Sequence, residues 1–127
     1  MITMKELNPH GYTTNQFIDK NLAILLERMN ELRDAYDKPM IVTSGLRSEE
    51  QQAGLIAQGK TNAKNSKHLA GAACDILDEN GELKKWIMDN VKILEKIGLW
   101  CEDFGHTPTW CHFQIMAPGS GKRFFIP

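Results

Sequence analysis

The sequence predicts an α+β fold, a small antiparallel sheet with helices packed on it, and two observations carry that prediction. Helical and β-prone segments alternate along residues 13–96, and two further β-prone segments, 99–102 and 110–115, follow with a loop between them. A closing antiparallel pair favours α+β over a doubly wound parallel sheet. The 127 residues suit one domain, which we expect to span 1–127 with its motif-bearing core at about 40–116.

The first helix is expected to begin at Thr13 or Thr14 as N-cap and to end near Asp37. Apolar side chains recur along it at intervals of three and four residues, which is the spacing of one helical stripe. These side chains are Phe17, Ile18, Leu22, Leu25, Leu26, Met29, Leu32 and Tyr36. Pro39 ends the helix, because the residue before a proline disfavours helical geometry. Residues 1–12 are expected to be an irregular lead-in.

The later elements rest on short β-prone runs, one serine cap and one turn sequence. They are a strand at 40–43, a helix from Ser48 to about Gly59, a polar loop at 59–67, a strand at 72–77, a turn at 78–81 and a helix at 82–96. The loop 103–109 then joins the two closing strands.

The charge and the N-terminus bound the partners and the place of synthesis. The formal net charge is −1, which gives no electrostatic case for nucleic acid as the main partner. No apolar run approaches the roughly 18 to 20 residues that a membrane-spanning helix needs, so we expect no membrane insertion. The N-terminus lacks the basic and then apolar layout of a secretion signal, so we expect a protein made in the cytoplasm.

Three cysteines, Cys74, Cys101 and Cys111, form an odd number and lack the Cys-x-x-Cys spacing of a zinc clip. We expect three reduced, buried thiols, as is usual in the cytosol. A disulfide or a thiolate ligand remains the alternative, since Cys111 is adjacent to a candidate ligand.

His68, Asp75 and His112 are the candidate metal ligands. His68 and Asp75 lie seven residues apart, and Gly71 between them permits a tight turn that could bring both side chains to one point. His112 lies on a predicted strand, where it shares a face with Gln114. Two imidazoles and a carboxylate suit zinc and leave a fourth position open, as catalysis needs.

The alternative explanation is a metal-free α+β interaction domain in which His68 and Asp75 form only a buried hydrogen-bonded pair. The other two histidines, His10 and His106, are expected to be solvated. Ser66 is expected to orient the turn before His68 through its hydroxyl group.

Three ordered motifs resemble the zinc D-alanyl-D-alanine carboxypeptidase family, which includes VanX and VanY type enzymes and many phage endolysins that cut L-alanyl-D-glutamate bonds. The motifs are Ser44-Gly45-Leu46-Arg47-Ser48, Ser66-x-His68-x-x-Gly71-x-Ala73-x-Asp75 and Trp110-x-His112. The resemblance implies the fold shared with the Hedgehog signalling domain, and a Zn²⁺ ion held by His68, Asp75 and His112. It further implies a zinc peptidase, either carboxypeptidase or endopeptidase, acting on D-amino-acid-containing stem peptides of bacterial peptidoglycan.

The same resemblance suggests a phage or prophage protein that acts on the cell wall after release or as a virion component, with other phage proteins as further partners. It assigns Arg47 to substrate binding or to stabilisation of the oxyanion. The residues agree, because Arg47 sits between a strand and a capped helix, and a guanidinium offers a fixed fork of donors.

The general base departs from the family pattern. Many relatives carry Glu or Asp three residues before the last zinc histidine, where this chain has Thr109, and others carry Asp at the position of Gln114. If the closing strands pair about residue 107, Glu102 lies across from His112, so Glu102 is our candidate base. Asp103 and His106 stay open as alternatives. Without a base, the chain would be a degenerate zinc-containing binding or structural module.

Overall fold

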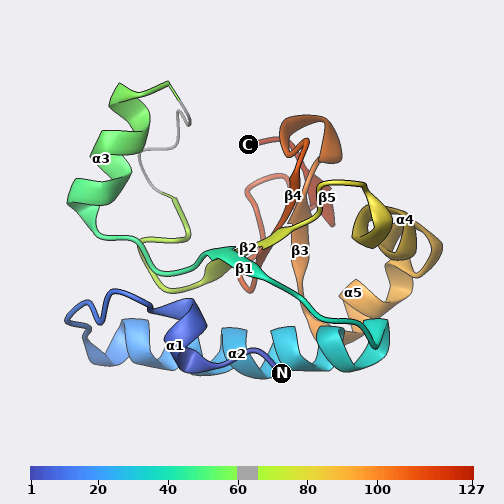
Figure 1. Ribbon diagram of the computed structural model, residues 1–127, viewed down its shortest axis with the longest axis horizontal. Helices are drawn as coiled ribbons and strands as arrows, with labels where there is room; N and C mark the ends of the chain where they lie inside the picture. Colours follow the sequence, from blue (N-terminus) through green and yellow to red (C-terminus); the bar gives the residue numbers. More distant parts are fainter. Residues whose placement is uncertain (60–65) are drawn as a thin grey trace.

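The computed structural model describes residues 1–59 and 66–127, and its helices and mixed sheet form the predicted α+β fold (Figure 1). The helices are α1 (Met4–Leu7), α2 (Gln16–Tyr36), α3 (Glu49–Ala57), α4 (Glu82–Asp89) and α5 (Val91–Ile97), with a 3-10 turn η1 (Phe104–His106). The strands are β1 (Val42–Ser44), β2 (Ala73–Leu77), β3 (Trp100–Glu102), β4 (Trp110–Gln114) and β5 (Phe124–Phe125). Most of the loop predicted at 59–67 falls on residues 60–65, outside the described residues.

The strands form one sheet in the order β1-β2-β4-β3-β5. The pairs β1-β2, β2-β4 and β3-β4 are antiparallel, as predicted, whereas β5 pairs with β3 in parallel and makes the sheet mixed. Strand β5 was not predicted, because a strand of two residues has no periodicity to detect. Its pairing is visible only in space, where Cys101 N donates to Arg123 O and Asp103 N to Phe125 O.

The long helix α2 confirms the predicted stripe and end but not the predicted cap. Asn15, rather than Thr13 or Thr14, is the N-cap, and its side chain accepts the N–H of Ile18 at 2.8 Å. At the other end Asp37 takes a left-handed conformation, with φ 56°. The buried residues of the helix are Asn21, Leu22, Leu25, Met29, Leu32 and Tyr36. Phe17, expected on this stripe, lies in the first turn and is 59% exposed.

Further differences from the prediction concern the lead-in, the first strand and the last helix. The lead-in contains the short helix α1, which Thr3 and Glu6 close with a capping box. The strand expected at 40–43 begins at Val42. Ile41 precedes it, and the Ile41 carbonyl accepts the N–H of Leu77 at the end of β2. The helix expected at 82–96 is broken into α4 and α5 at Asn90, whose side-chain amide donates to Trp86 O at 2.9 Å and so competes with the helical ladder.

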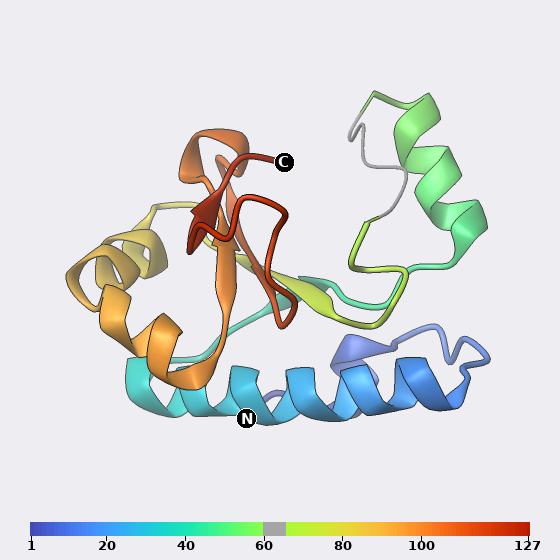
Figure 2. The same ribbon diagram turned by 180° about the vertical axis from the view of Figure 1, so that it is seen from behind.

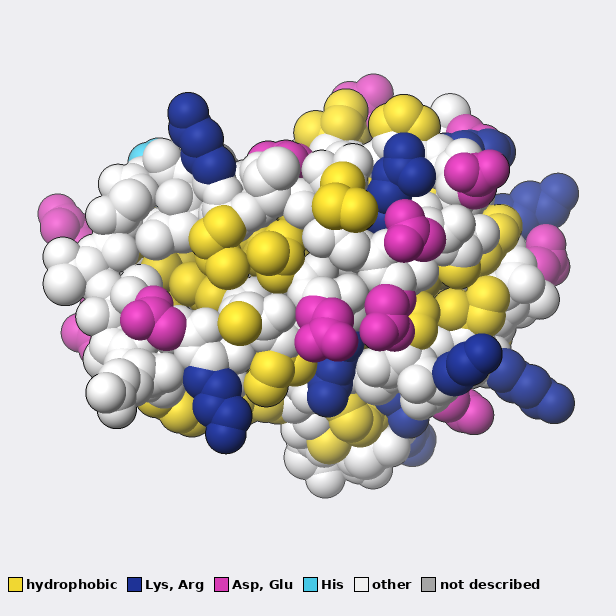
Figure 3. Space-filling view, turned by 90° about the horizontal axis from the view of Figure 1, so that it is seen from below, with side chains coloured by type: hydrophobic (Ala, Val, Ile, Leu, Met, Phe, Trp, Pro, Cys, Tyr) yellow, Lys and Arg dark blue, Asp and Glu magenta, His cyan; other side chains and the backbone are white. Residues whose placement is uncertain are grey.

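The helices lie at three positions around the sheet, as both ribbon views show. Helix α2 runs beneath the sheet, α4 and α5 lie at one end, and α3 lies at the other end (Figures 1 and 2). Leu25, Met29 and Leu32 of α2 and Phe113 of β4 are fully buried in the same core. On the face of the molecule seen from below in Figure 3, acidic and basic side chains lie among apolar ones. Within the described residues, no helix has the length and apolar character to cross a membrane.

Candidate metal centre

Asp75 and His112 lie opposite each other on neighbouring strands. The register of β2 against β4 pairs Asp75 with His112, and the pairs on either side are Cys74 with Phe113 and Ile76 with Cys111. Directly opposed residues of an antiparallel pair share a face of the sheet and have Cβ atoms about 5 Å apart. The two side chains therefore meet on the face that does not carry Phe113, the largest fully buried side chain of the core.

His68 reaches the same point from the turn that precedes β2. Gly71 takes a φ of +69°, and Gly71 N donates to His68 O at 3.3 Å. The turn needs glycine for two reasons. The left-handed backbone conformation is strained for a residue that has a Cβ atom. A Cβ at this position would also lie only 3.0 Å from Ile18 Cγ2 and from Leu22 Cγ. Ser66 Oγ accepts the N–H of His68 at 3.2 Å, which confirms its predicted role in orienting the turn.

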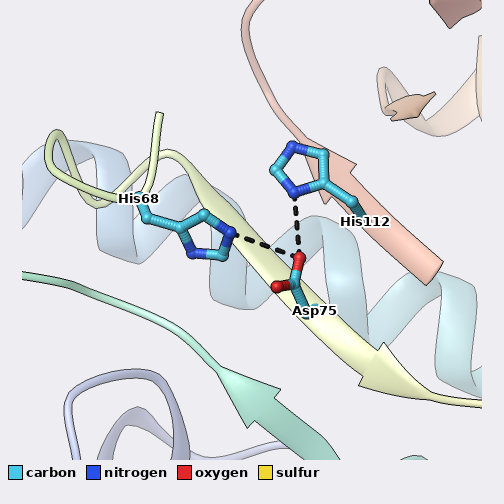
Figure 4. Close-up of side chains that lie close together, drawn as sticks. All are labelled: His68, Asp75 and His112. Atoms are coloured by element: carbon cyan, nitrogen blue, oxygen red, sulfur yellow. Dashed lines mark hydrogen bonds and ion pairs between the residues drawn. The ribbon is translucent and has the colours of Figure 1, made fainter. Parts of the chain in front are cut away.

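The three side chains converge on one carboxylate oxygen (Figure 4). Asp75 Oδ1 lies 3.2 Å from His68 Nε2 and 2.9 Å from His112 Nδ1. One ligand atom from each residue lies within 4.8 Å of the other two, so these residues form a group able to hold a metal ion. His68 and Asp75 are buried and His112 is nearly so. The predicted proximity of the three candidates is thus present in the fold.

Asp75, His68 and His112 shift one another's pKa values. Burial would raise the pKa of Asp75, but the charge of His68 and the hydrogen bonds from both histidines outweigh it and hold the pKa well below its usual range. Burial lowers the pKa of His68. Burial would also lower the pKa of His112, yet its hydrogen bond to Asp75 and the charge of that carboxylate raise it above the ordinary value. Asp75 therefore stays ionised and attracts a cation, either a proton on His112 or a metal.

A hydrogen bond on the far side of the His68 ring determines which ring nitrogen faces Asp75. His68 Nδ1 lies 2.8 Å from the carbonyl oxygen of Gly45, which only accepts, so Nδ1 carries a hydrogen and Nε2 is the nitrogen that faces Asp75. A positive charge between Nε2 and the ionised carboxylate, either a proton or a metal ion, makes this close approach favourable. Outer contacts of this kind are the usual means of orienting metal-binding histidines.

Arg47 lies beside the candidate ligands and is mostly buried, with 14% of its side chain exposed. Nη2 lies 3.4 Å from Asp75 Oδ2, Nε donates to Ser44 Oγ at 3.0 Å, and Nη1 donates to Gln52 Oε1 at 3.0 Å. Gln52, in the first turn of α3, is only 2% exposed. The guanidinium is therefore locked in place with one edge on the carboxylate of Asp75.

Of the three candidate bases, only Glu102 approaches the ligands. The β3-β4 register pairs Trp100 with Gln114 and Cys101 with Phe113. Glu102 is the next residue of β3 beyond the paired Cys101, and His112 is the next residue of β4 before Phe113, so the same register would bring the two together. Burial raises the pKa of Glu102, with the charge of His112 opposing the rise.

The other two candidates pair with each other at the surface. Asp103 Oδ2 lies 3.2 Å from His106 Nδ1, and both side chains are nearly half exposed. Asp103 also caps η1 by accepting the N–H of Gly105 at 3.1 Å.

The cysteines confirm the expectation of free, buried thiols. Cys111 Sγ lies 3.8 Å from Asp78 Oδ2, away from the candidate ligands. Burial raises the pKa of Cys111 to about 12, and burial raises the pKa of Cys74 and Cys101 as well. A thiol of this kind stays protonated near neutral pH and is a poor metal ligand.

Sequence reasoning missed four residues that contact this site. They are Ser44, Gly45, Gln52 and Phe125. Ser44 and Gly45 belong to the motif Ser44-Gly45-Leu46-Arg47-Ser48, in which only Arg47 was assigned a role. Phe125 comes from the unpredicted strand β5, and its ring stands edge-on to that of His112 with the centroids 6.0 Å apart. No sequence signal pointed to Phe125, because it lies 13 residues beyond His112 in a tail rich in glycine and proline.

The comparisons with known proteins agree with this fold. No curated protein matches the chain. Among solved structures, the chain is similar to the crystal structure of the L-Ala D-Glu endopeptidase ChiX of Serratia marcescens, with 21% sequence identity and a TM-score of 0.56, covering 91% of this chain and 99% of that one. At this identity the likeness shows the fold alone. The Peptidase M15 family model matches residues 1–106, a range that contains His68 and Asp75 and stops short of His112. Because that match covers most of the sequence, the chain belongs to the Peptidase M15 family.

Proposed function

We propose that the chain is a single-domain zinc peptidase that hydrolyses D-amino-acid-containing stem peptides of bacterial peptidoglycan. The observation that carries the proposal is the convergence of His68, Asp75 and His112, whose ligand atoms lie within 4.8 Å of one another. Membership of the Peptidase M15 family supports the peptidase activity. The substrate class rests on the sequence motifs and on the similarity to ChiX, which is named an L-Ala D-Glu endopeptidase. A phage or prophage origin belongs to the same proposal.

The donor set fits zinc. Tetrahedral zinc holds nitrogen and oxygen ligands at about 2.0 to 2.2 Å, which separates neighbouring ligand atoms by roughly 3.3 Å. The separations from Asp75 Oδ1 are 3.2 Å to His68 and 2.9 Å to His112. Three protein ligands leave one position for water or substrate, which distinguishes catalytic from structural zinc sites. When bound there, zinc supplies Lewis acidity, which polarises a carbonyl group and acidifies water.

Two charged residues supply the remaining functions of a hydrolase. Glu102 is proposed as the general base, which takes a proton from the attacking water and later gives one to the leaving amine. Its raised pKa suits this role, since a base works best when its pKa lies nearer the working pH. Arg47 is proposed to hold Asp75 through Oδ2 and to offer its other N–H groups to a substrate carboxylate or to the oxyanion.

The test combines metal analysis with digestion of purified peptidoglycan. We expect about one zinc per chain by elemental analysis, and stem-peptide fragments by mass spectrometry that a chelator abolishes. Glu102→Gln should lower turnover by roughly 10²- to 10⁴-fold while zinc content stays unchanged. The matched control is Asp103→Asn, which keeps an acceptor for the N–H of Gly105 at the adjacent position and should stay close to wild type.

Two results would count against the peptidase. A chain without zinc would remove the metal centre and leave a buried His–Asp pair as its explanation. Zinc with no turnover would favour the second candidate function, a degenerate binding or structural module. That alternative has an observation of its own, because Thr109 stands where many relatives carry an acidic base. Full activity in Glu102→Gln, together with loss of activity in Asp103→Asn, would instead assign the role of general base to Asp103.

A further inference from the structure

His112 presents its two ring nitrogens to two different partners. Nδ1 lies 2.9 Å from Asp75 Oδ1, and Nε2 lies 2.9 Å from Gln114 Oε1. An imidazole that binds a metal ion through one nitrogen keeps a hydrogen only on the other nitrogen, which then donates a hydrogen bond. Which nitrogen holds the hydrogen decides which one is able to bind a cation.

The side-chain amide of Gln114 has one possible orientation. Its nitrogen lies 2.8 Å from the carbonyl oxygen of Met116, and a carbonyl oxygen only accepts. The NH₂ end must therefore face Met116, which turns Oε1 towards His112. Because Oε1 also only accepts, Nε2 carries a hydrogen, and Nδ1 is the nitrogen that faces Asp75 and is able to exchange its own hydrogen for a metal ion.

Gln114 is buried and paired on both sides within the sheet. Gln114 is 3% exposed and is paired with Ala73 of β2 on one side and Trp100 of β3 on the other. It shares a strand face with His112, two residues away on β4. The chain bends at residues 115–116, directly after the strand, and the carbonyl of Met116 is thereby within reach of the amide.

We propose that Gln114 is the positioning residue of the metal centre: its amide oxygen holds the Nε2–H of His112 and so commits Nδ1 to the metal. The inference rests on the proposed zinc site. Its direct consequence is that the two imidazoles bind through different atoms, His68 through Nε2 and His112 through Nδ1. The carbonyl of Gly45 fixes the first and the amide of Gln114 fixes the second.

The two outer contacts differ in one respect that makes the proposal testable. A backbone carbonyl survives every substitution at Gly45, whereas the amide of Gln114 is removed by a single change. A purely structural role for Gln114 would alter stability but leave the His112 tautomer and the metal affinity untouched. The tautomer and the affinity are therefore the readouts that separate positioning from packing.

Three variants give the affinity test. Gln114→Met keeps the length of the side chain and removes the acceptor, so zinc affinity, measured by competition with a chromophoric chelator, should fall roughly 10- to 100-fold. Gln114→Glu keeps an oxygen facing Nε2 and should restore the affinity to within a few-fold of wild type. Gln51→Met is the control, since the amide of Gln51 accepts from the Tyr12 hydroxyl at 3.1 Å; its zinc affinity should equal that of wild type.

The second measurement needs no variant. Long-range ¹H–¹⁵N NMR of the zinc-loaded wild type should find the ring hydrogen on Nε2 of His112 and on Nδ1 of His68. A ring hydrogen on Nδ1 of His112 would overturn the proposal even if Gln114→Met failed to fold. Equal zinc affinity in wild type and Gln114→Met would overturn it too, with the peptidase proposal intact. A wild type that binds no zinc would remove the proposed function itself, and the inference with it.

Discussion

Gly45→Ala probes the close backbone approach that supports His68. The φ of Gly45 is not positive, so alanine suits the backbone and only the added methyl group matters. That Cβ would lie 2.2 Å from the carbonyl oxygen of Leu7, and the gap must widen by about 1.2 Å to reach an ordinary 3.4 Å contact. The neighbouring hydrogen bond from Leu46 N to Leu7 O is 2.7 Å long and would break in the process.

These contacts set the expected size of the effect. A lost hydrogen bond destabilises by about 0.5 to 1.5 kcal/mol and overpacking by about 1 to 3 kcal/mol, so the free energy of unfolding should fall by about 2 to 4 kcal/mol. Because the carbonyl of Gly45 orients His68, zinc affinity should fall roughly 10- to 100-fold as well. Urea denaturation of the metal-free protein and a chelator competition measure the two effects separately.

Gly54→Ala provides the matched control with the opposite sign. Gly54 lies within α3, and apart from its chain neighbours and the backbone of its own helix, no atom of the described residues lies within 4 Å of a Cβ built there. Alanine should therefore stabilise the protein by about 0.5 to 1 kcal/mol through helix propensity alone. If Gly45→Ala denatured at the urea concentration of wild type or above it, the close approach of Leu7 would not constrain this corner and the reasoning would be wrong.

Two further predictions concern the charges of the site. Zinc binds the deprotonated imidazole, so the raised pKa of His112 should make zinc affinity fall as the pH drops, starting above the ordinary histidine value of 6.5; chelator competition between about pH 8 and pH 5 measures this, and an affinity independent of pH would contradict it. Arg47→Lys keeps a positive charge near Asp75 but loses the fork of donors. Zinc affinity should stay within about tenfold of wild type while turnover of stem peptides falls roughly 10²- to 10³-fold. Full turnover in this variant would limit Arg47 to holding Asp75.

The elements that sequence reasoning located correctly are those whose signal is local. The stripe of α2 repeats over some five turns, and the cap at Ser48 needs only Gln51 three residues on. The alternation along β4 likewise sets His112 and Gln114 on one face, where their side chains meet at 2.9 Å. Each of these features is decided within a few residues of the chain, where the period of the backbone fixes which side chains are neighbours.

The elements that sequence reasoning missed depend on partners distant in the chain. The strand β5 exists because β3 offers it an edge, and the break at Asn90 reflects one side chain that competes for the carbonyl of Trp86. The three partners of Arg47 come from β1, α3 and β2, and no spacing in the sequence relates them. Such contacts form only when the elements are packed, so local periodicity carries no trace of them.

The amino-acid sequence by itself determined the class of fold, through local periodicity, and proposed the three candidate ligands, through residue types in motifs that resemble a known family. The tertiary structure alone decided how those ligands are held: which nitrogen of each imidazole faces inward, what fixes it there, and which acidic residue lies beside them. The physical reason is that a hydrogen bond needs a partner at a defined distance and angle, and the register of β2, β4 and β3 supplies those distances only after residues nearly forty positions apart have paired.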